Sequence, residues 1–166
     1  MTNNKQLQLA LEIATMAHKN VQRRNGDPYI FHALRVANNS TYIRTKTQKA
    51  AGILHDVIED TPFDEEFLRQ QGIDEAILDV LRFLTHDKEA ITYEDYIAHI
   101  CQNVDAMLVK LADLTDNLDQ GTLPVLKERD IERFKTYKTA QQTIMETLAK
   151  EHPDIFQEIL FRERFL

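Results

Sequence analysis

The sequence predicts an all-α protein, an orthogonal helical bundle. Gly and Pro occur only four times each in 166 residues, whereas helix-favouring Leu, Ile, Ala, Glu, Lys and Gln are abundant. Apolar residues recur at intervals of three and four, and no segment shows the alternation of a strand. At this length the simplest arrangement is a single domain over residues 1–166 with one core.

The first part of the chain predicts three helices. Periodic apolar residues place the first over residues 4–22, and a Gly-Asp-Pro turn separates it from a short helix that carries His32. Thr45 or Thr47 caps a third helix, which runs to about Asp60. Small residues in this helix would let another helix approach closely: Ala50, Ala51 and Gly52.

Helix-breaking residues and helix caps divide the rest of the chain into further helices. Gly72 stops a short helix, and a periodic helix follows over residues 74–84. Thr92 caps the next helix, with Asp95 three residues on. Asn103 or Asp105 begins the next helix, and Gly121 and Pro124 break the chain after it. A charged helix follows over about 125–150. Pro153 separates it from a last helix, in which Ile155, Ile159 and Phe165 are apolar.

Charge and cysteine content restrict the class of protein. A net charge of −7 argues against a polynucleotide-binding surface, but it leaves room for a small phosphorylated ligand. Cys101 is the single cysteine, so no internal disulfide forms, which suits a reducing cytoplasm. The amphipathic amino terminus resembles neither a signal peptide nor a membrane span. We therefore expect a soluble cytoplasmic protein that does not bind membranes.

The most informative segment is Ala-Ala-Gly-Ile-Leu-His-Asp-Val-Ile-Glu-Asp at residues 50–60. Helical spacing puts Glu59 one turn above His55 and Asp60 one turn above Asp56. Unpaired charge is costly on such an apolar helix, and a divalent cation would offset that cost. The segment therefore predicts a metal site with acid/base groups above it.

Two further segments supply ligands of the same kind. His32 lies near the start of the short second helix, and Asp113 lies in an apolar helix with Asn117 one turn later on the same face. His32, His55, Asp56 and Asp113 would form a shell with positions open to water and substrate. The alternative is a buried salt-bridge network without an ion. Ligand chemistry alone allows Mn²⁺, Fe²⁺, Co²⁺ or Zn²⁺.

These motifs, in this order, resemble those of the HD-domain metal phosphohydrolases, and more narrowly the hydrolase domain of the RelA/SpoT proteins and their small stand-alone homologues. The resemblance rests on Arg-Arg-Asn-Gly-Asp-Pro-Tyr-Ile-Phe-His, Ala-Gly-Ile-Leu-His-Asp-Val-Ile-Glu-Asp-Thr and Val-Lys-Leu-Ala-Asp-Leu-Thr-Asp-Asn, and spans about Leu7 to Tyr137. It implies the HD-domain helical bundle and Mn²⁺ as the metal.

The resemblance also implies roles for individual residues. Glu59 and Asp60 match the carboxylate pair that positions and deprotonates the attacking water. Residues matching nucleotide contacts are Arg23, Arg24, Asn117 and Tyr137. Each has a simpler reading: Glu59 and Asp60 as a charged helix end, the arginines as a solvated loop pair, Asn117 as a helix-surface amide, and Tyr137 as a core aromatic.

The implied reaction is metal-dependent hydrolysis of the 3′-pyrophosphate of guanosine 3′,5′-bis(diphosphate) or its pentaphosphate relative, so the expected partner is a small guanine nucleotide. The alternatives are phosphatase action on another nucleotide and a non-catalytic nucleotide-binding role. Three residues depart from the family pattern: Ala33 replaces the usual Pro, Leu114 a basic residue, and Asp116 an aromatic residue or His. We expect the last two to make the pocket rim less basic, which bears on the substrate.

Overall fold

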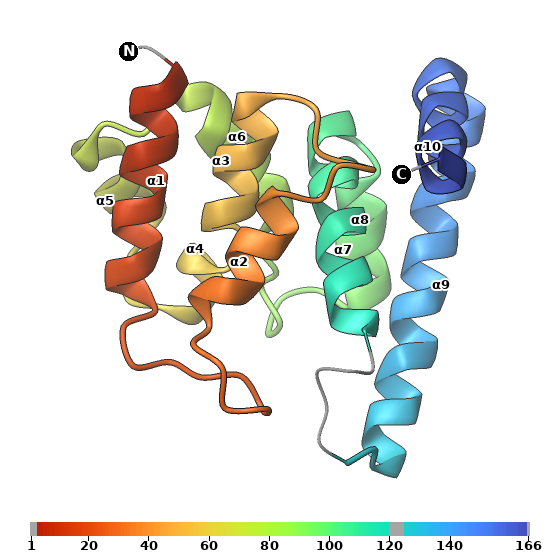
Figure 1. Ribbon diagram of the computed structural model, residues 1–166, viewed down its shortest axis with the longest axis horizontal. Helices are drawn as coiled ribbons and strands as arrows, with labels where there is room; N and C mark the ends of the chain where they lie inside the picture. The colour runs from red at the N-terminus through yellow and green to blue at the C-terminus, as the bar shows by residue number, and fades with distance from the viewer. Residues whose placement is uncertain (1–2, 120–124, 166) are drawn as a thin grey trace.

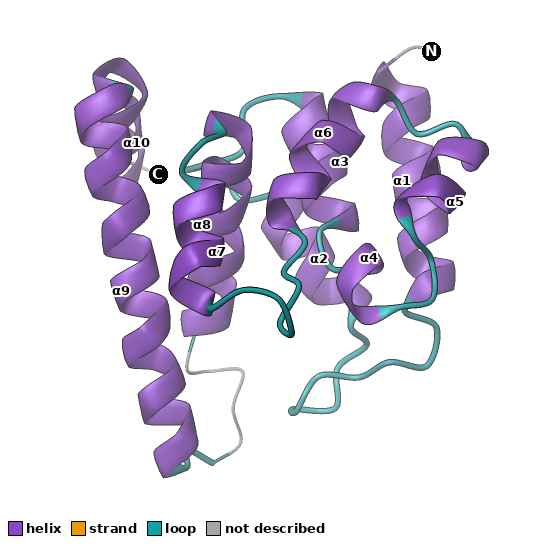
Figure 2. Cartoon of the chain, turned by 180° about the vertical axis from the view of Figure 1, so that it is seen from behind, coloured by secondary structure: helices purple, strands orange, loops and turns teal. Residues whose placement is uncertain are grey.

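The computed structural model describes residues 3–119 and 125–165, and these residues form helices joined by short loops (Figure 1, Figure 2). Within those two ranges there is no strand, only one bridge between Gln22 and Pro28. The predicted all-α fold is confirmed. The helices are α1 (Asn3–Ala17), α2 (Ile30–Ala37), α3 (Lys46–Leu54), α4 (Val57–Asp60), α5 (Glu65–Gln71), α6 (Glu75–Leu84), α7 (Tyr93–Ile100), α8 (Val104–Leu118), α9 (Glu128–Glu151) and α10 (Pro153–Phe165).

Helices α3 and α8 form the centre of the bundle. α3 packs against α1, α2, α6 and α8, and α8 in turn packs against α2, α6, α7 and α9. Along the long axis of the molecule, α1 lies towards one end, and α9 with α10 lies at the other (Figure 1). The histidine-aspartate motif directly follows α3, and Asp113 lies on α8.

The close approach predicted at Gly52 is confirmed. A Cβ atom at Gly52 would lie 3.2 Å from the Cα of Ala37, so the side chain of any other residue would meet the backbone of α2. Thr45 is the cap of α3: its side chain accepts a hydrogen bond from the backbone amide of Gln48. The side-chain oxygen of Gln48 in turn accepts one from the backbone amide of Thr45, which completes a capping box. The cap and the glycine together fix where α3 lies against α2.

Several other boundaries match the prediction. Gly72 ends α5 in the left-handed conformation at φ 96°. The side chains of Thr92 and Asn103 accept hydrogen bonds from Asp95 and Ala106 at the starts of α7 and α8. Gly121 and Pro124 lie outside the described residues.

Three expectations about the helices were wrong. The first helix ends at Ala17 instead of residue 22, because a turn with Asn20 at φ 68° leads into a narrow loop closed by the Gln22–Pro28 bridge. The helix expected to reach Asp60 unbroken is interrupted at His55 and Asp56, which separate α3 from α4. Phe165 is 62% exposed and does not pack in the core, whereas Ile159 is fully buried.

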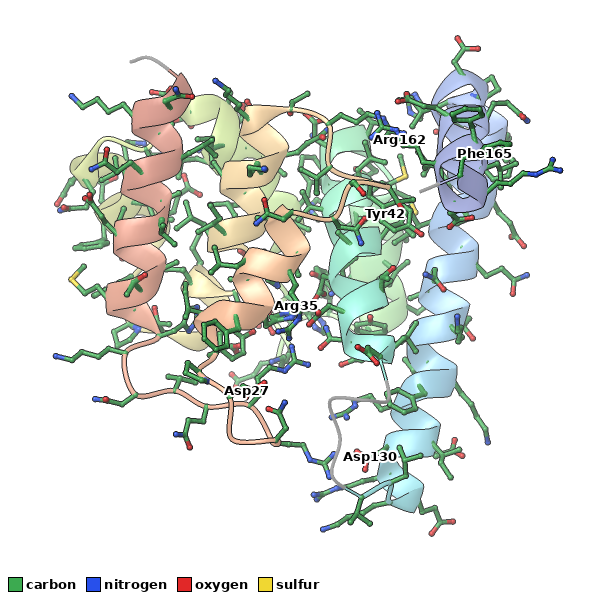
Figure 3. The ribbon with its side chains drawn as sticks, viewed as in Figure 1. Asp27, Arg35, Tyr42, Asp130, Arg162 and Phe165 are labelled. Carbon is green, nitrogen blue, oxygen red and sulfur yellow. The ribbon has the colours of Figure 1, made fainter. Side chains whose placement is uncertain are left out.

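The carboxyl-terminal helix is fastened to the loop between α2 and α3. Arg162 donates a 2.5 Å hydrogen bond to the carbonyl of Ser40, and the hydroxyl of Tyr42 lies 3.0 Å from the Glu163 carboxylate (Figure 3). Arg44 forms an ion pair with Glu158 at 3.1 Å. These contacts hold α10 against the part of the chain that leads into α3.

We predict that Gly52→Val destabilises the protein by about 1–3 kcal/mol, because the added side chain would overpack the contact between α3 and α2. Thr47→Val puts the same side chain elsewhere in α3 and should change the free energy of unfolding by less than about 0.5 kcal/mol. Urea unfolding of both variants checks this. Equal stability of the two variants would contradict a tight contact at Gly52.

Candidate functional site

Four side chains from three parts of the chain meet at the centre of the bundle. His32 comes from α2, Asp113 from α8, and His55 and Asp56 from the turn between α3 and α4. A ring nitrogen of each histidine and a carboxylate oxygen of Asp56 all lie within 4.8 Å of one another. Asp113 Oδ1 lies 3.2 Å from His32 Nε2 and 3.5 Å from His55 Nε2.

The break in the helix explains why two consecutive residues can share one site. Neighbouring side chains on an unbroken α-helix diverge by roughly 100° around the axis. The turn at His55 and Asp56 instead brings His55 Nε2 to 3.0 Å from Asp56 Oδ2. Sequence reasoning identified both residues but placed them on a continuous helix.

The hydrogen bonds of the two imidazoles fix which nitrogen faces the cluster. His55 Nδ1 donates to the carbonyl oxygen of Gly52 at 2.8 Å, because a carbonyl can only accept. His32 Nδ1 is 2.6 Å from Asp116 Oδ2, and a carboxylate likewise accepts. In a neutral imidazole, Nε2 of each ring therefore presents a lone pair to the cluster.

This arrangement fits a divalent cation. His55 Nε2 is buried and has no hydrogen-bond partner, and it faces carboxylate oxygens that are also electron-rich. Ligand atoms bound to a metal at about 2.0–2.2 Å lie roughly 3–4 Å from one another, as they do here. The two carboxylates match the charge of the ion, and imidazole with carboxylate is a donor set typical of Mn²⁺, Fe²⁺, Co²⁺ or Zn²⁺.

Asp113 is ionised despite its burial. Burial alone would raise its pKa, but the charge of Lys110, whose Nζ lies 2.9 Å from Oδ2, outweighs this and lowers the pKa well below its usual range. The side chain of Lys110 is only 13% exposed, and its ammonium lies 5.2 Å from the ring centre of Tyr96. Sequence reasoning missed Lys110, although a lysine among the apolar residues of α8 is the signal that identifies it.

The cluster opens into a cavity of about 600 Å³. Its walls come from residues 21–24 of the loop after α1, from α4, from the loop after α6 and from α9. All four predicted nucleotide contacts lie in this wall: Arg23, Arg24, Asn117 and Tyr137. Lining residues that sequence reasoning did not assign to the site include Tyr29, Lys88, Lys110 and Arg133; His86, which it left aside, also lines the cavity.

The predicted catalytic carboxylates both line the cavity. Glu59 forms a 2.6 Å ion pair with Lys88 and accepts a 3.2 Å hydrogen bond from the amide of His86. Asp60 ends α4, and partial removal of its carboxylate from solvent, together with the nearby charges of Asp56 and Glu59, raises its pKa. Glu59 is thus held in place by Lys88 and the backbone of His86.

Tyr29 also enters the cluster. Its hydroxyl donates a hydrogen bond to Asp56 Oδ2, and burial followed by the charge of Asp56 raises the pKa of Tyr29 above its usual range. The phenol therefore stays protonated and acts as a donor. The ring of Tyr29 lies 4.5 Å from that of His18, which accounts for the burial of His18 outside the cluster.

Each cavity arginine is paired with an aspartate. Arg23 donates to Asp116 Oδ2 and to Asn117 Oδ1, both at 3.1 Å. Arg24 donates to Asp130, near the start of α9, and Arg133 lies 3.2 Å from the same carboxylate. Figure 3 shows Asp130 at the foot of α9, facing the loop that carries Arg24. Arg23 is largely shielded from solvent, whereas Arg24 is exposed and held by its ion pair with Asp130.

Two residues that depart from the family pattern, Leu114 and Asp116, do not lie on the pocket rim as expected. Leu114 is fully buried in the hydrophobic core, so it does not affect the charge of the pocket rim. Asp116 points to His32, Arg23 and Arg35 and is not among the cavity-lining residues. Burial opposes its ionisation, but hydrogen bonds from His32 and Arg35 lower its pKa to about 2. The expectation of a less basic rim was wrong for Leu114.

Among curated proteins, the chain is similar to part of larger enzymes. It is 34% identical over 130 residues to a guanosine-3′,5′-bis(diphosphate) 3′-pyrophosphohydrolase of Haemophilus influenzae, covering 72% of this chain and 19% of that protein. It is 35% identical over 142 residues to the bifunctional (p)ppGpp synthase/hydrolase SpoT of Escherichia coli, covering 78% of this chain and 20% of that protein. The chain thus spans about a fifth of the length of these relatives. No protein-family model matches it.

A solved structure has a similar fold over nearly its whole length. It is described as a metazoan ortholog of SpoT that hydrolyzes ppGpp; the TM-score is 0.71 at 22% identity, covering 97% of this chain and 96% of the other. The resemblance to SpoT-type hydrolases and the HD-type helical bundle are confirmed by these relatives. No helix among the described residues is long and apolar enough to cross a membrane.

We predict that Mn²⁺ raises the melting temperature of the EDTA-treated protein, because an ion that binds only the folded state adds about 2.7 kcal/mol at a concentration 100 times Kd. His55→Ala should abolish the increase. His152→Ala removes a histidine outside the cluster and should keep it. An equal Mn²⁺ response in both variants, measured by thermal unfolding, would show that the cluster does not bind the ion.

Proposed function

We propose that this relative of the SpoT-type enzymes forms a single hydrolase domain that removes the 3′-pyrophosphate of guanosine 3′,5′-bis(diphosphate) or its pentaphosphate relative. The observation that carries the proposal is the buried cluster of two imidazoles and two carboxylates at a cavity lined by arginines and lysines. The sequence relatives favour this nucleotide over others, since they are named for the same reaction.

The metal ligands in this proposal are His32, His55, Asp56 and Asp113, with Mn²⁺ as the ion. A bound divalent cation supplies positive charge next to the phosphate and makes a nearby water more acidic. The protein contributes ligands that are already oriented: Gly52 and Asp116 fix the two rings, and Lys110 keeps Asp113 ionised.

The two carboxylates above the cluster act on the attacking water. Water adds to the phosphorus that carries the ribose 3′ oxygen, the bond from that phosphorus to the 3′ oxygen breaks, and the products are pyrophosphate and GDP, or GTP from the pentaphosphate. Glu59, held by Lys88 and the amide of His86, orients the water, and Asp60 or Glu59 accepts its proton. We assign the contact with the ribose to Asn117, whose side chain donates a 2.6 Å hydrogen bond to Asp113.

The nucleotide occupies the rest of the cavity. Arg23 and Arg24 have the planar face and the donor groups that suit a base or a phosphate, and Tyr137 provides an aromatic wall from α9. Since both arginines are paired with aspartates, binding of phosphate exchanges one anionic partner for another.

A second candidate function is phosphatase action on another nucleotide. The observation that favours it is the pairing of the cavity cations with carboxylates: Arg23 with Asp116, Arg24 with Asp130 and Lys88 with Glu59. This pairing lowers the positive potential available to a substrate with two diphosphates. A less charged mononucleotide would fit such a cavity.

We predict Mn²⁺-dependent release of pyrophosphate from guanosine 3′,5′-bis(diphosphate), lost with EDTA and in the His55→Ala/Asp56→Ala variant. The assay measures pyrophosphate and GDP, with a panel of 5′-, 3′- and 2′-mononucleotides run in parallel. If the folded, Mn²⁺-loaded protein releases phosphate from a mononucleotide and no pyrophosphate from the bis(diphosphate), the second candidate function replaces the first.

We predict that Glu59→Gln lowers kcat by about 10²–10⁴-fold, the usual contribution of a positioned acid or base. Mn²⁺ affinity should stay within about twofold of the original protein, since Glu59 is outside the ligand set. Glu66→Gln, on the exposed face of α5, is the matched control and should leave kcat unchanged. Full turnover by the Glu59 variant would reject a catalytic role for that residue.

A further inference from the structure

Asp116 has an unusual number of charged partners for a residue outside the cavity. Its Oδ2 lies 2.6 Å from His32 Nδ1 and 3.1 Å from Arg23 Nη1, and its Oδ1 lies 2.5 Å from Arg35 Nε. Its side chain is only 9% exposed. Figure 3 shows Arg35 between α2 and α8.

The contacts of Asp116 continue into a closed ring of polar side chains. From His32 the ring passes to Asp113 at 3.2 Å, from Asp113 to Asn117 at 2.6 Å, and from Asn117 to Arg23 at 3.1 Å. Arg23 then returns to Asp116 at 3.1 Å. The ring thus contains two of the proposed metal ligands and two of the proposed nucleotide contacts.

We propose that Asp116 is a positioning residue that couples the metal site to the nucleotide site. By accepting the hydrogen bond of His32 Nδ1, it keeps the Nε2 lone pair directed at the ion. By binding Arg23, it keeps that guanidinium beside Asn117. Asp116 acts through these neighbours and does not itself touch the ion or the substrate. The inference rests on the metal site of the proposed function and is independent of which nucleotide is hydrolysed.

Sequence position adds to the geometric argument. Asp116 is one helical turn from Asp113 on α8 in the i, i+3 relation, so a ligand and the residue that orients another ligand share one rigid element. A shift of α8 against α2 would therefore disturb both His32 and Asp113. Carboxylates that orient a metal-bound histidine typically contribute about 10–100-fold to metal affinity.

The test is calorimetric titration of the EDTA-stripped protein with Mn²⁺, without nucleotide. Asp116→Ala should weaken Mn²⁺ binding by about 10–100-fold. Asp116→Asn, which keeps the shape and one acceptor oxygen, should weaken it by a smaller factor, at least about threefold. Far-ultraviolet circular dichroism checks that each variant is folded. If Asp116→Ala does not fold, the Mn²⁺ affinity of Asp116→Asn is the result that decides. Mn²⁺ affinity within twofold of the original protein in a folded Asp116 variant overturns the proposal.

Two control variants separate orientation from general charge. Asp79→Asn removes an exposed ion pair with Arg82 and should leave Mn²⁺ affinity unchanged. Arg35→Gln removes a partner of Asp116 but leaves the hydrogen bond to His32, so its effect should stay within about twofold. If charge alone set the affinity, loss of the Arg35 cation would strengthen Mn²⁺ binding while loss of the Asp116 anion weakened it. Opposite effects of similar size in Arg35→Gln and Asp116→Asn would therefore reject the orienting role.

A spectroscopic readout reports on the ring itself. Long-range proton–nitrogen correlation of ¹⁵N-histidine-labelled protein distinguishes the two tautomers of His32. The original protein should show a single tautomer protonated on Nδ1, and Asp116→Ala should show a mixture. An unchanged tautomer in that variant contradicts the proposal. If the original protein binds Mn²⁺ but does not hydrolyse guanosine bis(diphosphate), the proposed substrate is wrong and the role of Asp116 can still be tested. If the original protein binds no Mn²⁺, the proposed function and the role of Asp116 are both wrong.

Discussion

The contact between α2 and α3 at Gly52 determines how far apart the two histidines lie. A larger residue would push α2 outward, because the Cβ position is only 3.2 Å from the Ala37 backbone. The same glycine supplies the carbonyl that holds the His55 ring, and the ring centre of His55 lies 5.1 Å from that of His32. One backbone position therefore fixes both the helix spacing and the orientation of one imidazole.

Polar groups in the middle of an apolar bundle are tolerated only when they satisfy one another. His32, His55 and Asp113 are each less than 10% exposed, within a core composed mainly of Leu, Ile, Ala and Val. Lys110 and Asp116 supply the counter-charges from the same helix, one turn on either side of Asp113. Because α8 is rigid, these groups keep their relative positions without support from the loops.

Local sequence signals predicted the class of the fold, most helix ends and the identity of the four clustered residues. Thr45, Gly72 and Asn103 could be placed because capping depends on a few neighbouring residues. The break at His55 and Asp56 could not, since both residues tolerate helical conformation and only packing against α2 and α8 separates them. The pairing of Arg24 with Asp130 joins segments far apart in the chain, and no periodicity within either segment indicates it.

The pairing of Arg24 with Asp130 also bears on the order in which the site is completed during synthesis. The ribosome delivers His32, His55, Asp56 and Asp113 before it delivers any residue of α9. A nascent chain thus carries all four clustered side chains while Asp130, Arg133 and Tyr137 are still missing. The four clustered side chains are present first, and the part of the cavity wall that α9 supplies is added afterwards.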